Sequence, residues 1–245
     1  MRADLAAMLA VPVLFALERL RPRRPKRRDQ LERLVTNLAV GAAGALVMAL
    51  GDSKAAKAAA TLAEHQRWGL SRLPPGPLRT ALALLWLDWT LYLWHRATHR
   101  FAPLWRLHLP HHLDPALDTS TAWRFHPAEL LASVPFRFLQ VLAAGVPRDA
   151  LRLWQRLLFV SITFHHSNLK LPRRLERALE LFVMTPHLHT LHHSARSEER
   201  DANWSSGLTL WDRLHGTFLD AAEPAALGVD GHPPAVSVVD ALALR

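Results

Sequence analysis

The sequence contains no cysteine. This absence excludes disulfide bonds, thiolate zinc sites, cysteine-ligated iron–sulfur clusters and a cysteine nucleophile. Any metal site must therefore use histidine and carboxylate side chains, a ligand supply that favours zinc, iron, copper or nickel over calcium and magnesium. Several enzyme signatures are missing as well: the HExxH zinc-protease motif, the GxSxG hydrolase elbow, a flavin or nucleotide fingerprint, and a Glu-x-x-His pair at any glutamate.

Histidine is abundant instead, with 15 in the chain. Eight of them form three cassettes with spacings of three or four residues, which place side chains on one side of a helix. A tetrahedral ion needs only four protein ligands, so eight imidazoles predict a dinuclear site whose halves lie at 95–112 and 187–193. His65, His215 and His232 stand alone and are interpreted as surface or packed residues. The eight candidate catalytic ligands are His95, His99, His108, His111, His112, His189, His192 and His193.

Asp88 and Tyr92 precede His95 at helical offsets and share its face of the predicted helix. A carboxylate inside an apolar segment is costly and is by default a functional candidate. Metal-bound histidine usually donates its other ring N–H to a carboxylate or carbonyl. Asp88 and Tyr92 are therefore candidates for supporting the ligands from behind. The alternative, an Asp88 buried between helices and paired with a neighbouring segment, stays open.

Half of the residues are hydrophobic, and the apolar ones gather in segments at 5–17, 34–50, 80–94, 130–146 and 150–164. A basic run over residues 19–33 separates the first two segments, although the net charge is only +9. Apolar flanks favour a juxtamembrane loop facing anionic lipid. No recognised nucleic-acid motif accompanies the run, so we expect no nucleic-acid partner. The first segment reads as an uncleaved anchor that is short of a bilayer core and therefore needs its polar flanks, a tilt or an interfacial position.

A cytoplasmic position for the basic run brings every cassette to one face of the membrane. The third apolar segment then delivers His95 to the cytoplasm, and a hairpin at 130–164 keeps His126 and His166 on that side. We therefore expect an all-α integral-membrane bundle of about four spanning or re-entrant helices, with a cytosolic helical cap. The expected single domain, 1–245, comprises membrane helices (1–94), a first histidine region (95–129), the hairpin (130–164), a second histidine region and cap (165–220) and a tail (221–245).

The ordered cassettes HRATH, HLPHH and HTLHH resemble the fatty acid hydroxylase and sterol desaturase superfamily of integral-membrane di-iron enzymes. The flanking stretches TAWRFHP, HSN and WDRLHGTF are similar too, and the resemblance covers roughly residues 15–220. It implies His126 and His166 as further metal ligands, and it makes Asn168 a candidate for supporting them. His165 and His187 fall where the family pattern asks for no histidine, so they are left out of the ligand set.

The resemblance implies a lipid hydroxylase or desaturase that oxidises a C–H bond of a sterol or fatty-acyl substrate with O2 at two iron ions. Zinc readily occupies such sites on isolation. Electrons would come from NAD(P)H through a separate reductase or electron-transfer protein. The expected location is the bilayer, the inner (plasma) membrane in a bacterium, with the histidines on the cytoplasmic side.

Two classes of alternative remain open at this point. One is an ether-lipid-cleaving or hydrolytic metalloenzyme on the same scaffold. The other is a non-enzymatic, histidine-rich membrane protein that binds or transports metal. A transporter places its ligands near the bilayer midplane. The cassettes here lie at the ends of apolar segments, which disfavours transport.

Overall fold

The computed structural model describes residues 2–243, and within that range the chain forms helices and loops with three isolated β-bridges and no sheet. Met1, Leu244 and Arg245 lie outside the described residues, so the last two positions of the expected tail are not among them. The all-helical class predicted from the sequence is confirmed. The long helices are α1 (Arg2–Leu20), α2 (Gln30–Val47), α3 (Ser53–His65), α4 (Pro77–Arg100), α6 (Pro127–Ala144) and α7 (Arg148–His166).

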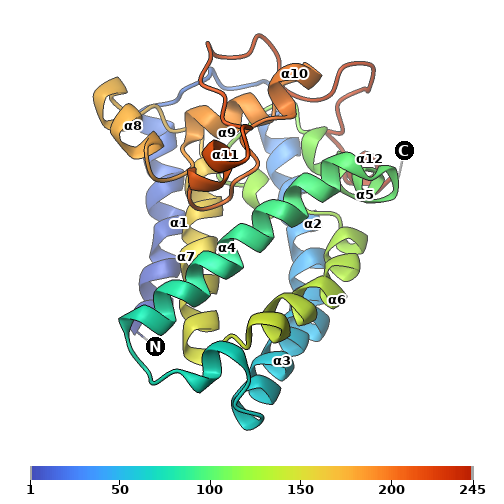
Figure 1. Cartoon of the computed structure of the whole chain (residues 1–245). Coiled ribbons are helices and arrows are strands. Elements are labelled where there is room, and N and C mark those ends of the chain that lie inside the picture. Colours follow the sequence, from blue (N-terminus) through green and yellow to red (C-terminus); the bar gives the residue numbers. More distant parts are fainter. Residues whose placement is uncertain (1, 244–245) are drawn as a thin grey trace.

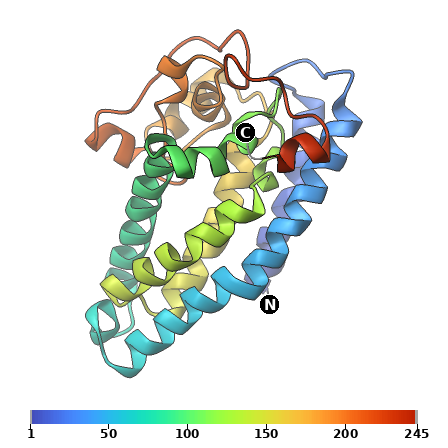
Figure 2. The ribbon, with the colours of Figure 1, turned by 90° about the vertical axis from the view of Figure 1, so that its right-hand side faces the viewer.

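The long helices run alongside one another, and the short helices gather at one end of them (Figures 1 and 2). A 3-10 turn, η2 (Gly69–Arg72), lies at the opposite end, before α4. The histidine-bearing ends of α4 and α7 point toward the gathered short helices, so the histidine cassettes lie at the same end of the bundle. We call these short elements and the loops between them the cap. They are α5 (Ala102–His112), η3 (Thr121–Trp123), α8 (Arg173–Glu180), α9 (Pro186–His192), α10 (Ser197–Arg200), α11 (Leu210–Leu214) and α12 (Val238–Leu242).

One helical stretch among the described residues is long and apolar enough to cross a membrane, by length and composition. It runs over Gln30–His65, in which an 18-residue part has a mean hydropathy of 1.8, and it joins α2 to α3 through the π-helical turn η1 (Met48–Asp52). Helix continues past the predicted apolar segment 34–50 as far as His65. The sequence SKAAKAAATLAEH favours helix strongly, and its alanines at 56, 59, 60 and 63 are buried.

The apolar core lies between α3, α4, α6 and α7, away from the cap. Alanine supplies much of it, and small side chains allow the helix backbones to approach closely. Close approach is also evident on α2, where a Cβ on Gly41 would lie 2.9 Å from Trp123 Cβ. The fully or nearly buried members are Ala56, Ala59, Ala60, Ala83, Leu87, Leu91, Val141, Val146, Ala150, Leu151 and Trp154.

Two tight turns cross at the far end of the bundle from the histidines. Gly145 ends α6 in the left-handed conformation (φ +63°), and a Cβ there would lie 2.1 Å from the Trp68 carbonyl oxygen. Gly69 (φ +53°) mirrors it, with a Cβ position 2.2 Å from the Ala144 oxygen. The Ser71 N–H and hydroxyl both donate to the Gly145 oxygen, at 2.9 and 2.8 Å. This crossing ties the α3–α4 connection to the α6–α7 connection.

Gly145→Ala is therefore expected to lower thermal stability more than a left-handed alanine alone would. The conformation costs roughly 1–2 kcal/mol, and the clash with Trp68 adds to it. Gly216→Ala is the matched control, because Gly216 has a similar φ (+68°) with nothing within 4 Å of its Cβ position. Melting temperatures of both variants in detergent test this; equal losses would contradict a close crossing at Gly145.

Part of the basic run is used inside the protein rather than facing lipid. Arg23 is paired with Glu176 and Glu223 in the cap, and Arg33 is almost fully buried against Asp114. The exposed cations are Arg21, Lys26, Arg27 and Arg28. Arg23 and Arg33 therefore depart from the predicted lipid-facing loop, because carboxylates from later in the chain lie close enough to pair with them.

Candidate metal centre

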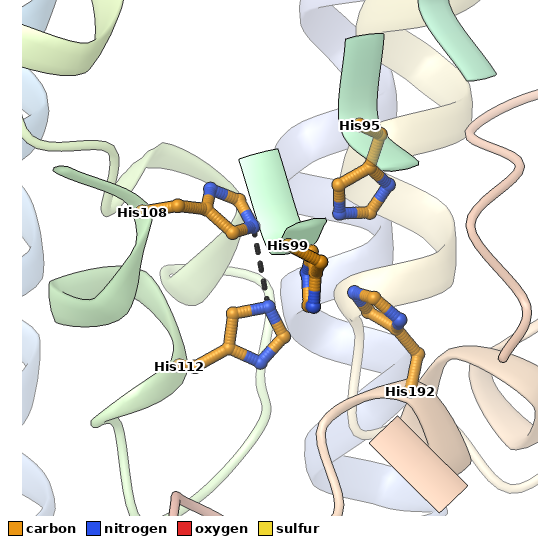
Figure 3. Close-up of side chains that lie close together, drawn as sticks. All are labelled: His95, His99, His108, His112 and His192. Atoms are coloured by element: carbon orange, nitrogen blue, oxygen red, sulfur yellow. Dashed lines mark hydrogen bonds between the residues drawn. The ribbon is translucent and has the colours of Figure 1, made fainter. Parts of the chain in front are cut away.

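The cassettes meet at the cap end of the bundle as two groups of histidines, and the candidate ligand atoms within each group all lie within 4.8 Å of one another. Figure 3 shows the side chains of the first group directed toward a common centre. The first group is His95, His99, His108, His112 and His192, and the second is His111, His166, His189 and His193. The eight predicted ligands and His166 are thus brought together; their binding of metal stays a prediction.

Helix geometry explains how one cassette serves both groups. Successive residues on a helix are about 100° apart. His111 and His112 therefore point in different directions from α5, and His192 and His193 do so from the end of α9. Pro103 and Pro186 stand in the first turns of these two helices, where a missing N–H costs nothing. The Thr185 hydroxyl also accepts from the Leu188 N–H at 3.4 Å and begins α9.

Burial favours the neutral form of five of the grouped histidines, those of α5 and α9 described next. Burial lowers the pKa of His111, His112, His189 and His193 well below the usual range, and neighbouring histidines reinforce the effect. Burial likewise lowers the pKa of His192 to about 3. Neutral imidazole is the form that binds metal, because it keeps a free lone pair.

The donor atoms fit a metal ion in each group. Both ring nitrogens of His99 and of His193, and Nε2 of His192, are buried without a hydrogen-bond partner. Buried polar atoms are normally paired, so an unpaired set pointing inward calls for a ligand. Nε2 atoms also face each other, at 3.2 Å between His108 and His112 and 3.0 Å between His166 and His189. Two nitrogens bound to one ion at about 2.1 Å lie about 3 Å apart when they meet at a right angle.

Peptide carbonyls hold the far sides of four of the nine rings. In the first group, Nδ1 of His95 lies 2.7 Å from the Trp204 oxygen, and Nδ1 of His192 lies 2.9 Å from the Ala202 oxygen. In the second group, Nδ1 of His111 lies 3.2 Å from the Arg124 oxygen, and Nδ1 of His166 lies 2.9 Å from the Ile162 oxygen. A bond of this kind fixes the ring orientation and leaves Nε2 as the ligand atom.

Glu129 is a supporting residue that the sequence did not indicate. Its Oε1 lies 2.8 Å from Nδ1 of His108, and its side chain is 8% exposed. Glu129 follows His126 by three residues in the first turn of α6. The signal available in the sequence was an acidic residue beside the histidine regions, and only the packing of α6 against α5 reveals its partner.

Asp88 and Tyr92 hold the cap to α4 and do not contact the grouped histidines through hydrogen bonds. Asp88 Oδ2 accepts from the Leu208 N–H at 2.9 Å and from Trp211 Nε1 at 2.8 Å. The Tyr92 hydroxyl pairs with the Thr217 hydroxyl at 3.0 Å. The expected support of His95 from Asp88 is corrected, and the alternative of a buried Asp88 paired with a neighbouring segment describes this structure.

His126 lies outside both groups, which corrects its expected place among the ligands. Pro127 begins α6, so His126 takes the extended N-cap position, where its Nδ1 accepts from the Ala128 N–H at 3.1 Å. Asn168 is also corrected as a supporting residue. Its side-chain amide bonds the backbone N–H and C=O of Arg24, both at 2.9 Å, and so anchors the loop before α2.

The other histidines occupy places consistent with their exclusion from the ligand set. His165 is buried with its ring centroid 4.1 Å from that of His189, yet it belongs to neither group. His187 pairs with Asp220 and Glu223 at 3.2 and 3.4 Å. His215 accepts from Trp89 Nε1 at 3.1 Å, while His65 and His232 are exposed.

A family model for fatty acid hydroxylase matches residues 80–217, a range that contains both histidine groups. The chain belongs to the fatty acid hydroxylase family. This confirms the superfamily that the cassettes indicated. It also gives the two buried groups a chemical context, since the matched range runs from α4 through the last segment of the cap.

Characterised relatives are lipid-oxidising enzymes by name. Ornithine lipid hydroxylase of Rhizobium tropici is 28% identical over 206 residues, 83% of this chain and 61% of that protein. Human alkylglycerol monooxygenase is 30% identical over 156 residues, covering 62% and 33% of the two chains. Human lathosterol oxidase is 28% identical over 136 residues, covering 55% and 43%. The chain thus spans less than two thirds of each relative, and no solved structure matches it.

Proposed function

We propose that this protein is an O2-dependent, di-iron membrane oxidoreductase that hydroxylates or desaturates a lipid C–H bond. The observation that carries the proposal is the convergence of nine mutually facing histidines, seven of them buried, in two groups. The relatives' names supply the substrate class, a lipid. Electrons come from NAD(P)H through a separate reductase or electron-transfer protein, because the sequence has no flavin or nucleotide fingerprint.

Bound iron supplies the activation of O2 and the oxidising power for the C–H bond. The chain's residues do the rest. Neutral imidazoles hold the ions, and carbonyls behind His95, His111, His166 and His192 keep the rings from turning. Glu129 does the same for His108. Burial of seven of the nine histidines limits the access of water, which protects a strongly oxidising site from side reactions.

The bilayer is the proposed environment of the long helices. Large apolar side chains on α1, α2 and α6 face outward, where lipid would cover them. We propose the single-domain division given above, with the cap in the cytoplasm and the protein in the inner membrane of a bacterial cell. An acyl chain in the bilayer would then lie on the side of the histidines from which α4 and α7 rise. The outward apolar residues include Leu9, Val13, Leu17, Leu31, Val35, Leu38, Leu46, Leu131 and Leu139.

Membrane lipids of cells with and without the gene test the proposed reaction. We expect one lipid class to gain one oxygen or lose two hydrogens when the protein is present. Growth under ¹⁸O2 separates the alternatives, because an oxygenase places the heavy oxygen in a hydroxylated product and a hydrolase takes its oxygen from water. A product formed without O2 would contradict the proposal. An alkylglycerol lipid is the second candidate substrate, favoured by the relatives of that name.

A further inference from the structure

Two carbonyls of one short segment reach histidines that come from distant parts of the chain. The Ala202 oxygen bonds Nδ1 of His192 at 2.9 Å, and the Trp204 oxygen bonds Nδ1 of His95 at 2.7 Å. Both histidines belong to the first group. We call residues 202–205 the carbonyl segment. It is the shared backing for one ligand from α4 and one from α9.

The carbonyl segment has an uncommon backbone conformation between its two carbonyls. Asn203 has a φ of +55°, and among the described residues only one other non-glycine residue, Arg67, has a positive φ. The Asn203 side chain, fully buried, donates to the Leu188 and Leu219 oxygens at 3.2 and 2.8 Å. A left-handed non-glycine residue persists only where its surroundings hold it. These bonds keep both carbonyls aimed at the histidines.

Asp212 on α11 holds the other end of the carbonyl segment. Its Oδ1 accepts from the Trp204 N–H at 2.9 Å and from the Thr217 hydroxyl at 2.7 Å, and its Oδ2 accepts from the Ser205 N–H at 3.0 Å. The carboxylate is fully buried, and it makes no hydrogen bond to a histidine. Its effect on the ligands therefore passes through the backbone of Trp204.

We propose that Asp212 is a positioning residue dedicated to the first of the two metal sites. By holding the carbonyl segment, Asp212 fixes the ring of His95 through the Trp204 carbonyl. It fixes the ring of His192 through the nearby Ala202 carbonyl. In the second group the rings of His111 and His166 are held instead by the Arg124 and Ile162 oxygens, which lie outside this segment. The inference rests on the proposed two-metal site and adds that the two ions have separate supports.

Asp212→Asn tests this with little change in volume. The new amide has one acceptor oxygen and a donor NH2, so either the Trp204 or the Ser205 N–H loses its partner. Loss of a residue that orients a metal ligand typically weakens metal binding about 10–100-fold. We expect that weakening for one ion only, and wild-type affinity for the other.

The experiment titrates the full-length protein in detergent with ⁵⁷Fe(II) under anaerobic conditions. Metal per chain and Mössbauer spectra are read, with melting temperatures of the metal-free proteins alongside. The wild type should bind two irons and the Asp212→Asn variant one at iron concentrations that fill the wild-type sites. Asp88→Asn is the matched control, because Asp88 is also a buried carboxylate that accepts an N–H of the same cap region, from Leu208. It should lose stability and keep both irons.

Each outcome decides between distinct conclusions. Two irons bound normally by Asp212→Asn would overturn the inference, and so would an equal loss of both ions. Fewer than two irons in the wild type would overturn the proposed function itself. If Asp212→Asn does not fold, Thr217→Val removes only one donor to the same carboxylate. It should weaken the same ion by a smaller factor, and unchanged affinity there would count against the proposal.

Discussion

Replacing His193 by alanine is expected to lower the metal content from two ions per chain to one or none and to abolish lipid oxidation. His193 is fully enclosed, both of its ring nitrogens lack partners, and it is one of only four histidines in the second group. Its loss leaves that group three imidazoles and opens a cavity beside them. Iron content of the purified protein and product formation in cells both measure the effect.

Two histidines outside the groups provide the controls. His65 is exposed at the end of α3, and His126 caps α6, so alanine at either position should leave both ions bound. Full activity of His193→Ala would show that the two-group site is wrong. Loss of metal in His126→Ala would show that His126 moves into the site when metal binds, contrary to the arrangement described above.

Asp114→Ala is expected to destabilise the folded protein by up to about 3 kcal/mol, because the buried Arg33 guanidinium loses both bonds to this carboxylate and keeps only Asp118, at 3.0 Å, as an ionic partner. Arg33 on α2 donates to Asp114 Oδ1 at 2.6 Å and Oδ2 at 2.9 Å, and both side chains are almost wholly enclosed. Asn37 donates to the same carboxylate at 3.1 Å. The pair anchors α2 to the segment directly after α5, so its loss should also loosen the first histidine region.

Asp29→Ala is the matched control for Asp114→Ala. Arg27 and Asp29 form the same two-bond pair, at 2.9 and 2.8 Å, but in a more exposed position. Exposed pairs contribute less than about 1 kcal/mol. Unfolding in detergent followed by circular dichroism compares the two variants, and similar losses would contradict the importance of burial.

The contribution of the Asp114 carboxylate to stability also depends on pH. Burial would raise the pKa of Asp114, but the charge and hydrogen bonds of Arg33 outweigh it and hold the pKa below its usual range. A lowered pKa in the folded state means that the contribution is complete above the unfolded value of about 3.9. It is lost as the pH falls through the lower folded value.

The sequence by itself determined the features that depend only on residues close together along the chain. Spacings of three and four residues put imidazoles on one side of α4, α5 and α9, and alanine and leucine runs made the long segments helical. Those features follow from the helical period, so the helical class and the eight-histidine set needed no tertiary information. The resemblance of the cassettes to a known family rests on the same local patterns, and the family match confirmed it.

The tertiary structure decided which histidines share a group. His111 and His112 are adjacent in the chain, yet they belong to different groups: Nε2 of His111 faces that of His166 on α7, whereas Nε2 of His112 faces that of His108. The supports behind the rings were equally hidden. Every residue has a peptide carbonyl, so nothing in the sequence marks Ala202 or Trp204 as the hydrogen-bond partner of a histidine.

Residues with more than one plausible partner were decided only by packing. Asp88 shares a helical face with His95, yet the chain folds so that Leu208 and Trp211 reach its carboxylate first. His126 sits in a family-like stretch, yet the helix that begins at Pro127 uses its ring as a cap. Local spacing fixes which side of a helix a residue occupies, whereas the contact made on that side depends on segments brought together from elsewhere in the chain.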